Sequence, residues 1–301
     1  MRRLRRWGPG LLLVAPSLIA LGIFVYGFMG WTLRISFSDW NGRRPDLGNV
    51  GFANYRELAD ETTTVGQRFA IDVRNVIIFT VVFVVGSLIV GFVLALLLDR
   101  GAVGESFFRG VFIFPMAISF IAIAIIWRWL LSNGTGSQLT GINKLFHLAG
   151  LDFLQSNWFK SDSGWAIAAV ALPAGWALAG YVMALFLAGM RGVPEDLREA
   201  ARVDGAREPQ VFWHVVRPML LPVTMSALVI LAHISLKTFD LIYAMDLKSL
   251  KIDTPALYMW FTTYEGRAYG RGAAIAVLLL LGIAVIIVPY IWYSVRSERR
   301  T

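Results

Sequence analysis

The sequence of 301 residues contains no cysteine and only three histidines. Without thiols the chain forms neither disulfide bonds nor thiolate metal sites, and its redox compartment stays open. The histidines are far apart, and none belongs to an HExxH or comparable ligand spacing. They are His147, His214 and His233. We therefore predict no metal-binding site in this chain.

Charged residues are also scarce. They make up 16% of the chain, against about 25% in soluble domains, while 57% of the residues are hydrophobic and the mean hydropathy is +0.62. Each bilayer crossing needs roughly 20 apolar residues, so the length allows about six spans. The net charge of +8 alone would suggest either nucleic acid or a membrane surface as partner. In so apolar a chain we expect a lipid membrane and no nucleic acid.

The sequence also lacks a motif for binding the phosphates of ATP. No Gly-Lys dipeptide occurs anywhere in the chain, and the Walker A phosphate-binding loop requires one. This chain therefore cannot hydrolyse ATP through such a loop, and any ATP hydrolysis that drives it must take place on a partner protein.

Six apolar segments are long enough to cross a hydrocarbon core of roughly 30 Å as helices, which satisfy their own backbone hydrogen bonds there. They are Leu11–Trp31, Asn75–Leu98, Phe107–Leu131, Trp165–Ala188, Met219–Ile242 and Ala273–Tyr293. We predict an all-α membrane protein with six transmembrane helices, in which residues 11–293 form a single transmembrane domain. Prolines within or beside the spans allow kinks. They are Pro115, Pro173 and Pro222.

The distribution of arginine predicts the orientation. The amino terminus, residues 1–10, carries Arg2, Arg3, Arg5 and Arg6, and the carboxyl terminus, residues 294–301, carries Arg296, Arg299 and Arg300. The positive-inside rule places both termini in the cytoplasm, together with the segment 191–217. The amino-terminal arginines and the apolar run after them also resemble a cleaved signal peptide. We favour an uncleaved first helix, because no clear cleavage site is visible and five more spans follow.

The most informative stretch is the inside loop at residues 191–222. Pro194 suits the first turn of a helix, and Glu195-Asp196 places negative charge near the positive helix end. Asp204-Gly205 ends this helix, because glycine accepts the left-handed conformation of a sharp turn. A second short helix begins near Pro209.

Two helices this short are marginal in water, so we expect a docking partner to complete them. Leu197, Ala200 and Ala201 follow helical spacing and form a narrow apolar stripe, whose small side chains allow close approach. Glu199 supplies a charge at its rim. The alternative is an amphipathic loop that lies on lipid headgroups.

Three short groups of residues in this loop match a known motif in order and spacing. They are Glu199-Ala200-Ala201, Asp204-Gly205-Ala206, and Val215, Pro218, Leu221 and Pro222. The loop resembles the EAA loop of binding-protein-dependent ABC importer permeases, whose coupling helices sit in a cleft of the cytoplasmic ATPase subunit. The resemblance implies a role in ATPase coupling for Glu199, Ala200, Ala201, Asp204, Gly205, Ala206, Pro218 and Pro222.

The resemblance extends along nearly the whole chain. The segments 51–55, 108–115 and 239–243 are similar to the first of the two permeases in sugar importers of the maltose and glycerol-phosphate type. The segments 183–192 and 231–240 look most like permeases for glucose and mannose. Two features depart from the pattern: Arg207 and Pro209 replace a serine and a bulky residue, and Asp246–Lys251 replaces a glycine-rich turn.

The resemblance also implies the fold, the location, the partner subunits and the solute of the transporter. It implies a type I ABC importer permease fold in the prokaryotic plasma membrane and alternating access. The partners are a second homologous permease, cytoplasmic ATPase subunits that hold ATP and Mg²⁺, and an extracytoplasmic sugar-binding protein; this chain itself binds no cofactor. The solute is a monosaccharide such as glucose or mannose, with a disaccharide, an oligosaccharide or glycerol phosphate as alternatives.

Candidates for the sugar pathway lie on the fifth span. His233, Lys237 and Asp240 recur at i, i+4 and i+7 and share a helical face with Ser226. A charge within a span costs roughly 2.5 to 3.5 kcal/mol near its centre, which favours a functional role. Near the outer end, snorkelling or a mutual ion pair of Lys237 and Asp240 is the alternative. Trp176 could offer its ring to a sugar, although a packed or lipid-facing tryptophan is the commoner case.

Two rival functions remain. A secondary transporter would couple the solute to an ion through intramembrane carboxylates, and the predicted span interiors hold almost none. A membrane enzyme would need clustered histidine or acidic residues at the membrane face, and the three scattered histidines argue against it. We predict no catalytic residue.

Overall fold

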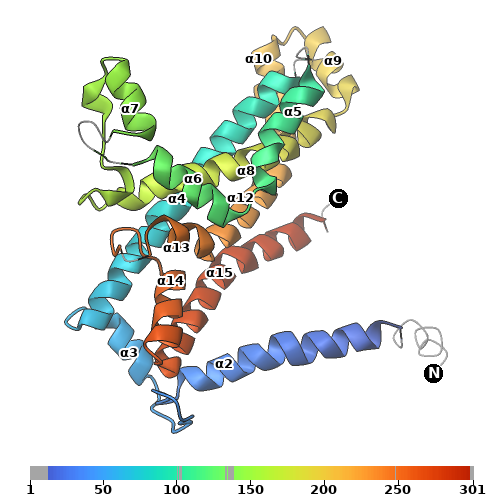
Figure 1. Ribbon diagram of the computed structural model, residues 1–301. Helices are drawn as coiled ribbons and strands as arrows, with labels where there is room; N and C mark the ends of the chain where they lie inside the picture. Colours follow the sequence, from blue (N-terminus) through green and yellow to red (C-terminus); the bar gives the residue numbers. More distant parts are fainter. Residues whose placement is uncertain are drawn as a thin grey trace, which may run out of the picture. The chain divides into compact units, whose positions relative to one another are not determined.

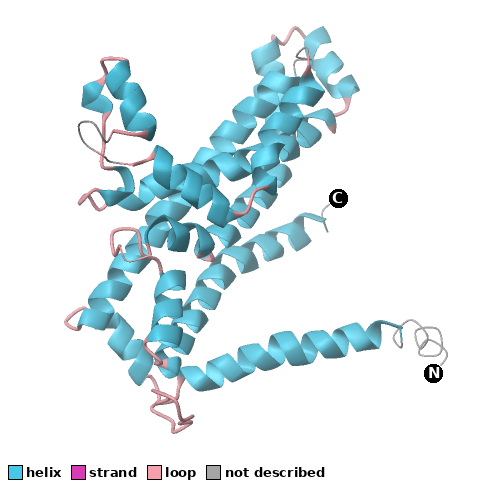
Figure 2. Ribbon diagram, in the orientation of Figure 1, coloured by secondary structure: helices cyan, strands magenta, loops and turns pink. Residues whose placement is uncertain are grey.

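In this computed structural model, the described residues are 13–99, 101, 104–132, 134, 139–247 and 249–298. This part of the chain consists of helices and loops (Figure 2), with two isolated β-bridges at Ser38–Asn49 and Asn41–Ala268. The all-α prediction is confirmed. The predicted start of the first span at Leu11 and the basic residues Arg2, Arg3, Arg5, Arg6, Arg299 and Arg300 lie outside the described residues.

The helices follow one another along the chain as coloured in Figure 1. They are η1 (Gly22–Gly27), α2 (Phe28–Ser36), α3 (Ala53–Ala59), α4 (Thr64–Asp99), α5 (Glu105–Ile113), η2 (Phe114–Ala117), α6 (Phe120–Leu130), α7 (Gly141–Leu148), η4 (Asp152–Leu154), η5 (Trp158–Lys160), α8 (Ala166–Arg191), α9 (Glu195–Val203), α10 (Glu208–Val211), η6 (Phe212–Val216), α11 (Arg217–Met219), α12 (Leu221–Leu236), α13 (Asp240–Asp246), α14 (Pro255–Trp260), η7 (Phe261–Glu265) and α15 (Tyr269–Glu298).

The chain divides into two compact units. The first unit comprises Met1–Gln67 and Tyr258–Leu280, and the second comprises Arg68–Leu257 and Leu281–Thr301. The loop at 191–222 and all five pathway candidates belong to the second unit.

Among the described residues, four helices are long and apolar enough to cross a membrane: Leu13–Ser36, Thr64–Asp99, Ala166–Arg191 and Tyr269–Trp292. The number rises to six if each of two bent helix pairs forms one span. These segments correspond to the six predicted spans, but several ends differ. The second span, for example, begins at Thr64 rather than Asn75.

The third predicted span, Phe107–Leu131, is wrong as a continuous helix. Its two halves, Glu105–Ala117 and Phe120–Leu130, meet at an angle of 100°. Pro115 lacks a backbone N–H, and the chain there tightens into the short 3₁₀ helix η2. Ile118 is then extended, and the Ser119 hydroxyl accepts the N–H of Ala122 at 3.2 Å, which caps α6.

The fifth predicted span, Met219–Ile242, begins within two residues of α12 but is wrong at its end. Its helix α12 ends at Leu236 and a separate helix, α13, begins at Asp240. The hydroxyl of Thr238 donates to the carbonyl of Ile234 at 3.0 Å, a local bond that competes with the helical ladder. At the other end, α12 is bent by 57° from Glu208–Met219.

Helix α8 is the centre of the second unit, because α5, η2, α6 and α12 all pack against it. Glycines permit its closest approaches. A Cβ added at Gly91 of α4 would lie 2.6 Å from the Cβ of Val182, and one added at Gly180 would clash with the carbonyl of Phe112. Close backbone packing of this kind stabilises helices in lipid, where burial of apolar surface gives no drive for association.

In the first unit, the segment 51–55 has a structural role. Gly51 adopts a positive φ of 58°, which lets the chain turn into α3. Asn54 then donates to the carbonyls of Ser36 and Ser38 at 3.0 Å, and Tyr55 donates to the Ser36 hydroxyl at 2.7 Å. These bonds satisfy carbonyls at the end of the first long helix.

Candidate functional site

The loop at 191–222 folds into the short helices α9 and α10, which lie at one end of the second unit (Figure 1), against the carboxyl ends of α4 and α8. As the sequence predicts, α9 follows Pro194 and carries Glu195-Asp196 in its first turn. It ends at Val203, and Gly205 turns the chain with a φ of 84°. Pro209 lies in the first turn of α10, where its missing N–H costs nothing.

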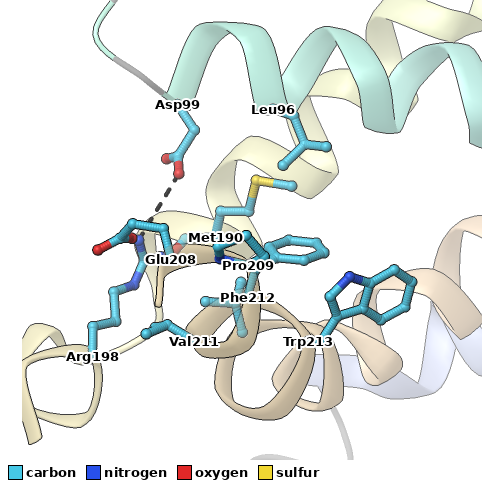
Figure 3. A pocket seen from close by; sticks show the side chains of 10 residues that line it. Leu96, Asp99, Met190, Arg198, Glu208, Pro209, Val211, Phe212 and Trp213 are labelled. Atoms are coloured by element: carbon cyan, nitrogen blue, oxygen red, sulfur yellow. Dashed lines mark hydrogen bonds and ion pairs between the residues drawn. The ribbon is translucent and has the colours of Figure 1, made fainter. Parts of the chain in front are cut away.

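The side chain of Arg198 anchors α9 to the second unit (Figure 3). It donates to the carbonyl of Met190 at 2.6 Å, so a positive charge meets the negative carboxyl end of α8. Its guanidinium also lies 4.0 Å from the carboxylate of Asp99, the last residue of α4, and 3.9 Å from that of Glu195. The side chain is 18% exposed, which limits screening by water.

A second arginine joins the two short helices. Arg202 donates to Glu208 of α10 at 2.7 Å and to Glu195 of α9 at 2.9 Å. Its hydrogen bonds to Glu208 and then to Glu195 raise the pKa of the Arg202 guanidinium. Because this cluster is exposed, it fixes geometry more than it adds stability. The unusual Arg207 caps α10, with its N–H donating to the Gln210 side chain at 2.8 Å.

A third arginine joins neighbouring elements. Arg191, the last residue of α8, pairs with Glu105, the first residue of α5, at 2.8 Å. The sequence reasoning missed all three arginine contacts. For α9 a signal was available, since Glu195, Arg198 and Arg202 recur at i, i+3 and i+7 on one face.

The outer face of α9 is exposed in the part of the chain that the structure describes. Glu199 and Ala200 are exposed, together with two larger apolar side chains, Leu197 at 47% and Val203 at 86%. Ala201 is only half-buried. Beyond the helix, Asp204 and Gly205 are exposed and Ala206 is half-buried. We call Leu197, Ala200 and Val203 the open face of α9.

The two remaining motif residues lie away from the open face. Pro218 lies in the first turn of α11 and Pro222 in the first turn of α12, and both are exposed. They flank the 57° bend before α12, where a residue without an N–H is tolerated.

A pocket of about 550 Å³ lies between α9, α10 and the ends of α4 and α8 (Figure 3). Its apolar lining includes Leu96, Met190 and Phe212, and its charged lining includes Asp99 and Arg198. The motif residues from Glu199 to Ala206 do not line it.

The structure brings three of the five pathway candidates together. His233, Lys237 and Asp240 line one pocket of about 230 Å³ with Phe120, although the helix breaks between Lys237 and Asp240. The shared helical face that the spacing predicts is therefore wrong, while the proximity is real. Lys237 makes its polar contact with His233, at 3.4 Å, rather than the predicted alternative contact with Asp240.

The other two candidates lie elsewhere. The Ser226 hydroxyl contacts the carbonyl of Pro222 at 2.9 Å and the hydroxyl of Tyr290 at 3.0 Å. Trp176 lines a mainly apolar cavity of about 680 Å³, with its ring 6.0 Å from that of Trp127. The candidates thus occupy three separate places in the second unit.

The other two histidines make local contacts. His147 pairs with Asp152 at 2.7 Å, and His214 contacts the carbonyl of Gln210 at 2.9 Å. Within the described residues, no group of three or more histidine, aspartate or glutamate side chains could hold a metal ion.

Comparison with known proteins identifies relatives over nearly the whole length. Residues 87–301 match the family described as binding-protein-dependent transport system inner membrane component. The chain is 37% identical over 292 residues to a probable ABC transporter permease protein of Pyrococcus horikoshii, covering 96% of this chain and 97% of that protein. It is 30% identical over 283 residues to a xylose/arabinose import permease protein of Haloferax volcanii, covering 93% and 86%.

A solved structure shares the fold. One chain in the crystal structure of a bacterial ABC transporter, involved in the import of the acidic polysaccharide alginate, aligns with a TM-score of 0.79 at 20% identity. The alignment covers 98% of both chains. At this identity the likeness shows the fold alone, which is that of an ABC importer permease.

Proposed function

This chain belongs to the family of binding-protein-dependent transport system inner membrane components, and we propose that it forms half of the transmembrane pathway of an ATP-driven sugar importer. Family membership makes it a multi-pass permease of the inner membrane and not the ATPase of the system. A substrate-binding protein and an ATPase are the partners of such a permease. The second half of the pathway, in our proposal, is a homologous permease.

The open face of α9 is the observation that supports a coupling role. A short helix that exposes Leu197 and Val203, yet is held firmly by Arg198, is suited to receive a partner. It lies in the loop that resembles the EAA motif. We therefore assign ATPase docking to the residues on and just after α9, with Pro218 and Pro222 shaping the exit into α12. The docking residues are Glu199, Ala200, Ala201, Asp204, Gly205 and Ala206.

The arginine anchors suggest how a movement of the ATPase reaches the membrane. When the ATPase subunits close around ATP and Mg²⁺, they push on α9. Arg198 links α9 to the carboxyl ends of both α8 and α4, through Met190 and Asp99. A displaced α9 therefore pulls on two long helices, and the pathway alternates between outward-facing and inward-facing states. This chain contributes no cofactor-binding residue to that cycle.

A sugar is the solute that the relatives support, since one of them is named as a xylose/arabinose import permease. The resemblance of segments 183–192 and 231–240 to glucose and mannose permeases supports a monosaccharide. In the pathway we place His233, Lys237 and Asp240, which share a pocket and offer hydrogen-bonding groups. Ser226 and Trp176 lie apart from that pocket, so this shared pocket does not support a role for them in the sugar pathway.

The absence of cysteine makes docking simple to test, because any introduced thiol is unique in this chain. We expect Ala200→Cys in α9 to cross-link to the ATPase subunit. It should react with a membrane-impermeant maleimide only after the cells are permeabilised. The matched control is Leu148→Cys, which is 72% exposed on α7 and which we place outside. Labelling of Ala200→Cys in intact cells, or cross-linking that is equal for both variants, would refute the assignment and the orientation.

The sugar is tested separately. The purified complex should hydrolyse ATP faster with a sugar-loaded binding protein than with the empty protein. The screen includes glucose, mannose, xylose, arabinose, disaccharides, oligosaccharides and glycerol phosphate. If no sugar stimulates hydrolysis while the cross-link at Ala200→Cys forms, the sugar assignment fails and the coupling assignment stands.

A further inference from the structure

A buried polar cluster in the second unit has no part in the proposed coupling. On α4, Arg68, Asp72 and Asn75 recur at i, i+4 and i+7 and so share one face. This face meets the segment 250–254, which lies just before α14. The Asn75 amide donates to the carbonyl of Asp253 at 2.9 Å, across 178 residues of sequence.

One of the two carboxylates in the cluster is fully partnered. Asp253 is 2% exposed and accepts two hydrogen bonds from the Arg68 guanidinium, at 2.5 and 3.0 Å. Its other oxygen accepts the N–H of Thr254 at 2.8 Å. The positive charge of Arg68 is thus already matched by Asp253.

The second carboxylate of the cluster, that of Asp72, differs from Asp253 in its hydrogen bonding. Asp72 is 0% exposed, and among the described residues neither of its carboxylate oxygens has a hydrogen-bond partner. The charges of Asp253 and Arg68 both act on it. Two neighbouring residues also keep a buried oxygen without a partner: the amide oxygen of Asn75 and the hydroxyl of Thr254, with Asn75 0% and Thr254 1% exposed. Since nearly all buried polar atoms find partners, four such oxygens on three buried residues indicate that the cluster binds a ligand.

We propose that Asp72, Asn75 and Thr254 bind a hard cation, and that the ion is sodium. All four free atoms are oxygens, the ligands that hard cations prefer over nitrogen and sulfur. The amide nitrogen of Asn75 is already bound to backbone carbonyls, which leaves its oxygen to face the site. With both carboxyl groups ionised, Asp72, Asp253 and the Arg68 guanidinium leave a single negative charge, which a monovalent ion balances and a divalent ion would overshoot.

The role that follows is structural cohesion. The ion would join α4 to the segment 250–254 beside the ion pair of Arg68 and Asp253. Spacing in the sequence could not reveal such a site, because its ligands come from two distant segments and include only one free carboxylate.

The test is the thermal unfolding of the full-length chain in its purified membrane complex, with sodium, potassium, lithium, calcium or magnesium replacing choline at constant ionic strength. We expect the Tm to rise with the logarithm of the sodium concentration above its Kd, by about 2 °C for each tenfold increase. Asp72→Asn keeps the shape of the side chain but removes its charge, and should abolish this dependence. Asp60→Asn, at an exposed carboxylate, should retain it.

Two results would overturn the site. The first is a wild-type Tm that no cation changes relative to choline, which would mean that the two carboxyl groups share a proton or that water fills the space. The second is an equal sodium shift in Asp72→Asn, which would mark a general salt effect. A Tm that rises with calcium and not with sodium would support the site and overturn the choice of ion. If Asp72→Asn fails to fold, the wild-type protein provides the test. A larger Tm increase with sodium than with potassium supports the site, and equal increases overturn it.

Discussion

Replacing Arg198 by methionine should uncouple ATP hydrolysis from transport. The substitution removes the charge but keeps an unbranched side chain of good helix propensity. It deletes the 2.6 Å bond to the carbonyl of Met190, and it leaves the carboxylates of Asp99 and Glu195 without this cation. A hydrogen bond from a charged group contributes about 1.5–3 kcal/mol, and a cation at a helix carboxyl end about 0.3–1 kcal/mol.

These terms together give about 2–4 kcal/mol for the docking of α9 on the second unit. We therefore expect the ratio of chains with α9 docked to chains with α9 undocked to fall by one to three orders of magnitude. The chain should still insert, because the hydrophobic spans are unchanged.

The assay is solute uptake by reconstituted complexes, measured together with ATP hydrolysis. Arg198→Met should lower uptake at least tenfold, and the hydrolysis that remains should no longer respond to the binding protein. The matched control is Arg202→Met, which removes an arginine from the exposed side of the same helix and should lower uptake far less. Normal uptake in Arg198→Met, or equal loss in both variants, would refute the anchoring argument.

Three further changes test other parts of the second unit. Gly180→Leu should lower the Tm by several degrees, because any side chain there meets the backbone of Phe112, whereas Gly86→Ala has open space and should leave the Tm nearly unchanged or raise it. His233→Ala or Asp240→Ala should impair uptake with normal membrane insertion, measured by transport and membrane content, and unchanged transport in both would exclude this pocket from the pathway. Ser119→Ala should cost about 0.5–2 kcal/mol of stability through loss of the α6 cap, measured by denaturation; no change would show that the bend does not depend on the cap.

Local signals in the sequence predicted local structure well. Hydropathy found every candidate span, because a lipid-spanning helix needs a long apolar run regardless of its neighbours. The ends of α9 were equally predictable, since Pro194 and Gly205 act through their own backbone preferences. The 100° break at Ile118 was harder. Pro115 indicates that the helix is disturbed there. A proline in a span can produce either a break or a mild kink, and packing against other helices determines which of these forms.

Contacts between distant residues could not be predicted. Arg198 bonds to the backbone carbonyl of Met190. Every residue type has this carbonyl, so the residue at position 190 does not indicate the bond. The meeting of Asp72 with the segment around Asp253 depends on how α4 packs, and no periodicity within one segment encodes it. Asp240 shares a pocket with His233 and Lys237, as expected, but not through one helical face, because the chain turns before Asp240 and still returns to the same pocket.

The structure also separates the two interpretations of α9 that the sequence left open. An amphipathic helix on lipid headgroups directs its arginines outward, towards the phosphates. Here Arg198 is turned inward to the end of α8, and Arg202 is occupied by Glu195 and Glu208. What α9 presents outward is Val203 and the rest of its open face, with the acid Glu199 beside it and no unpaired arginine of its own. Such a surface is poorly suited to anionic lipid and well suited to a protein cleft, which favours the docking interpretation.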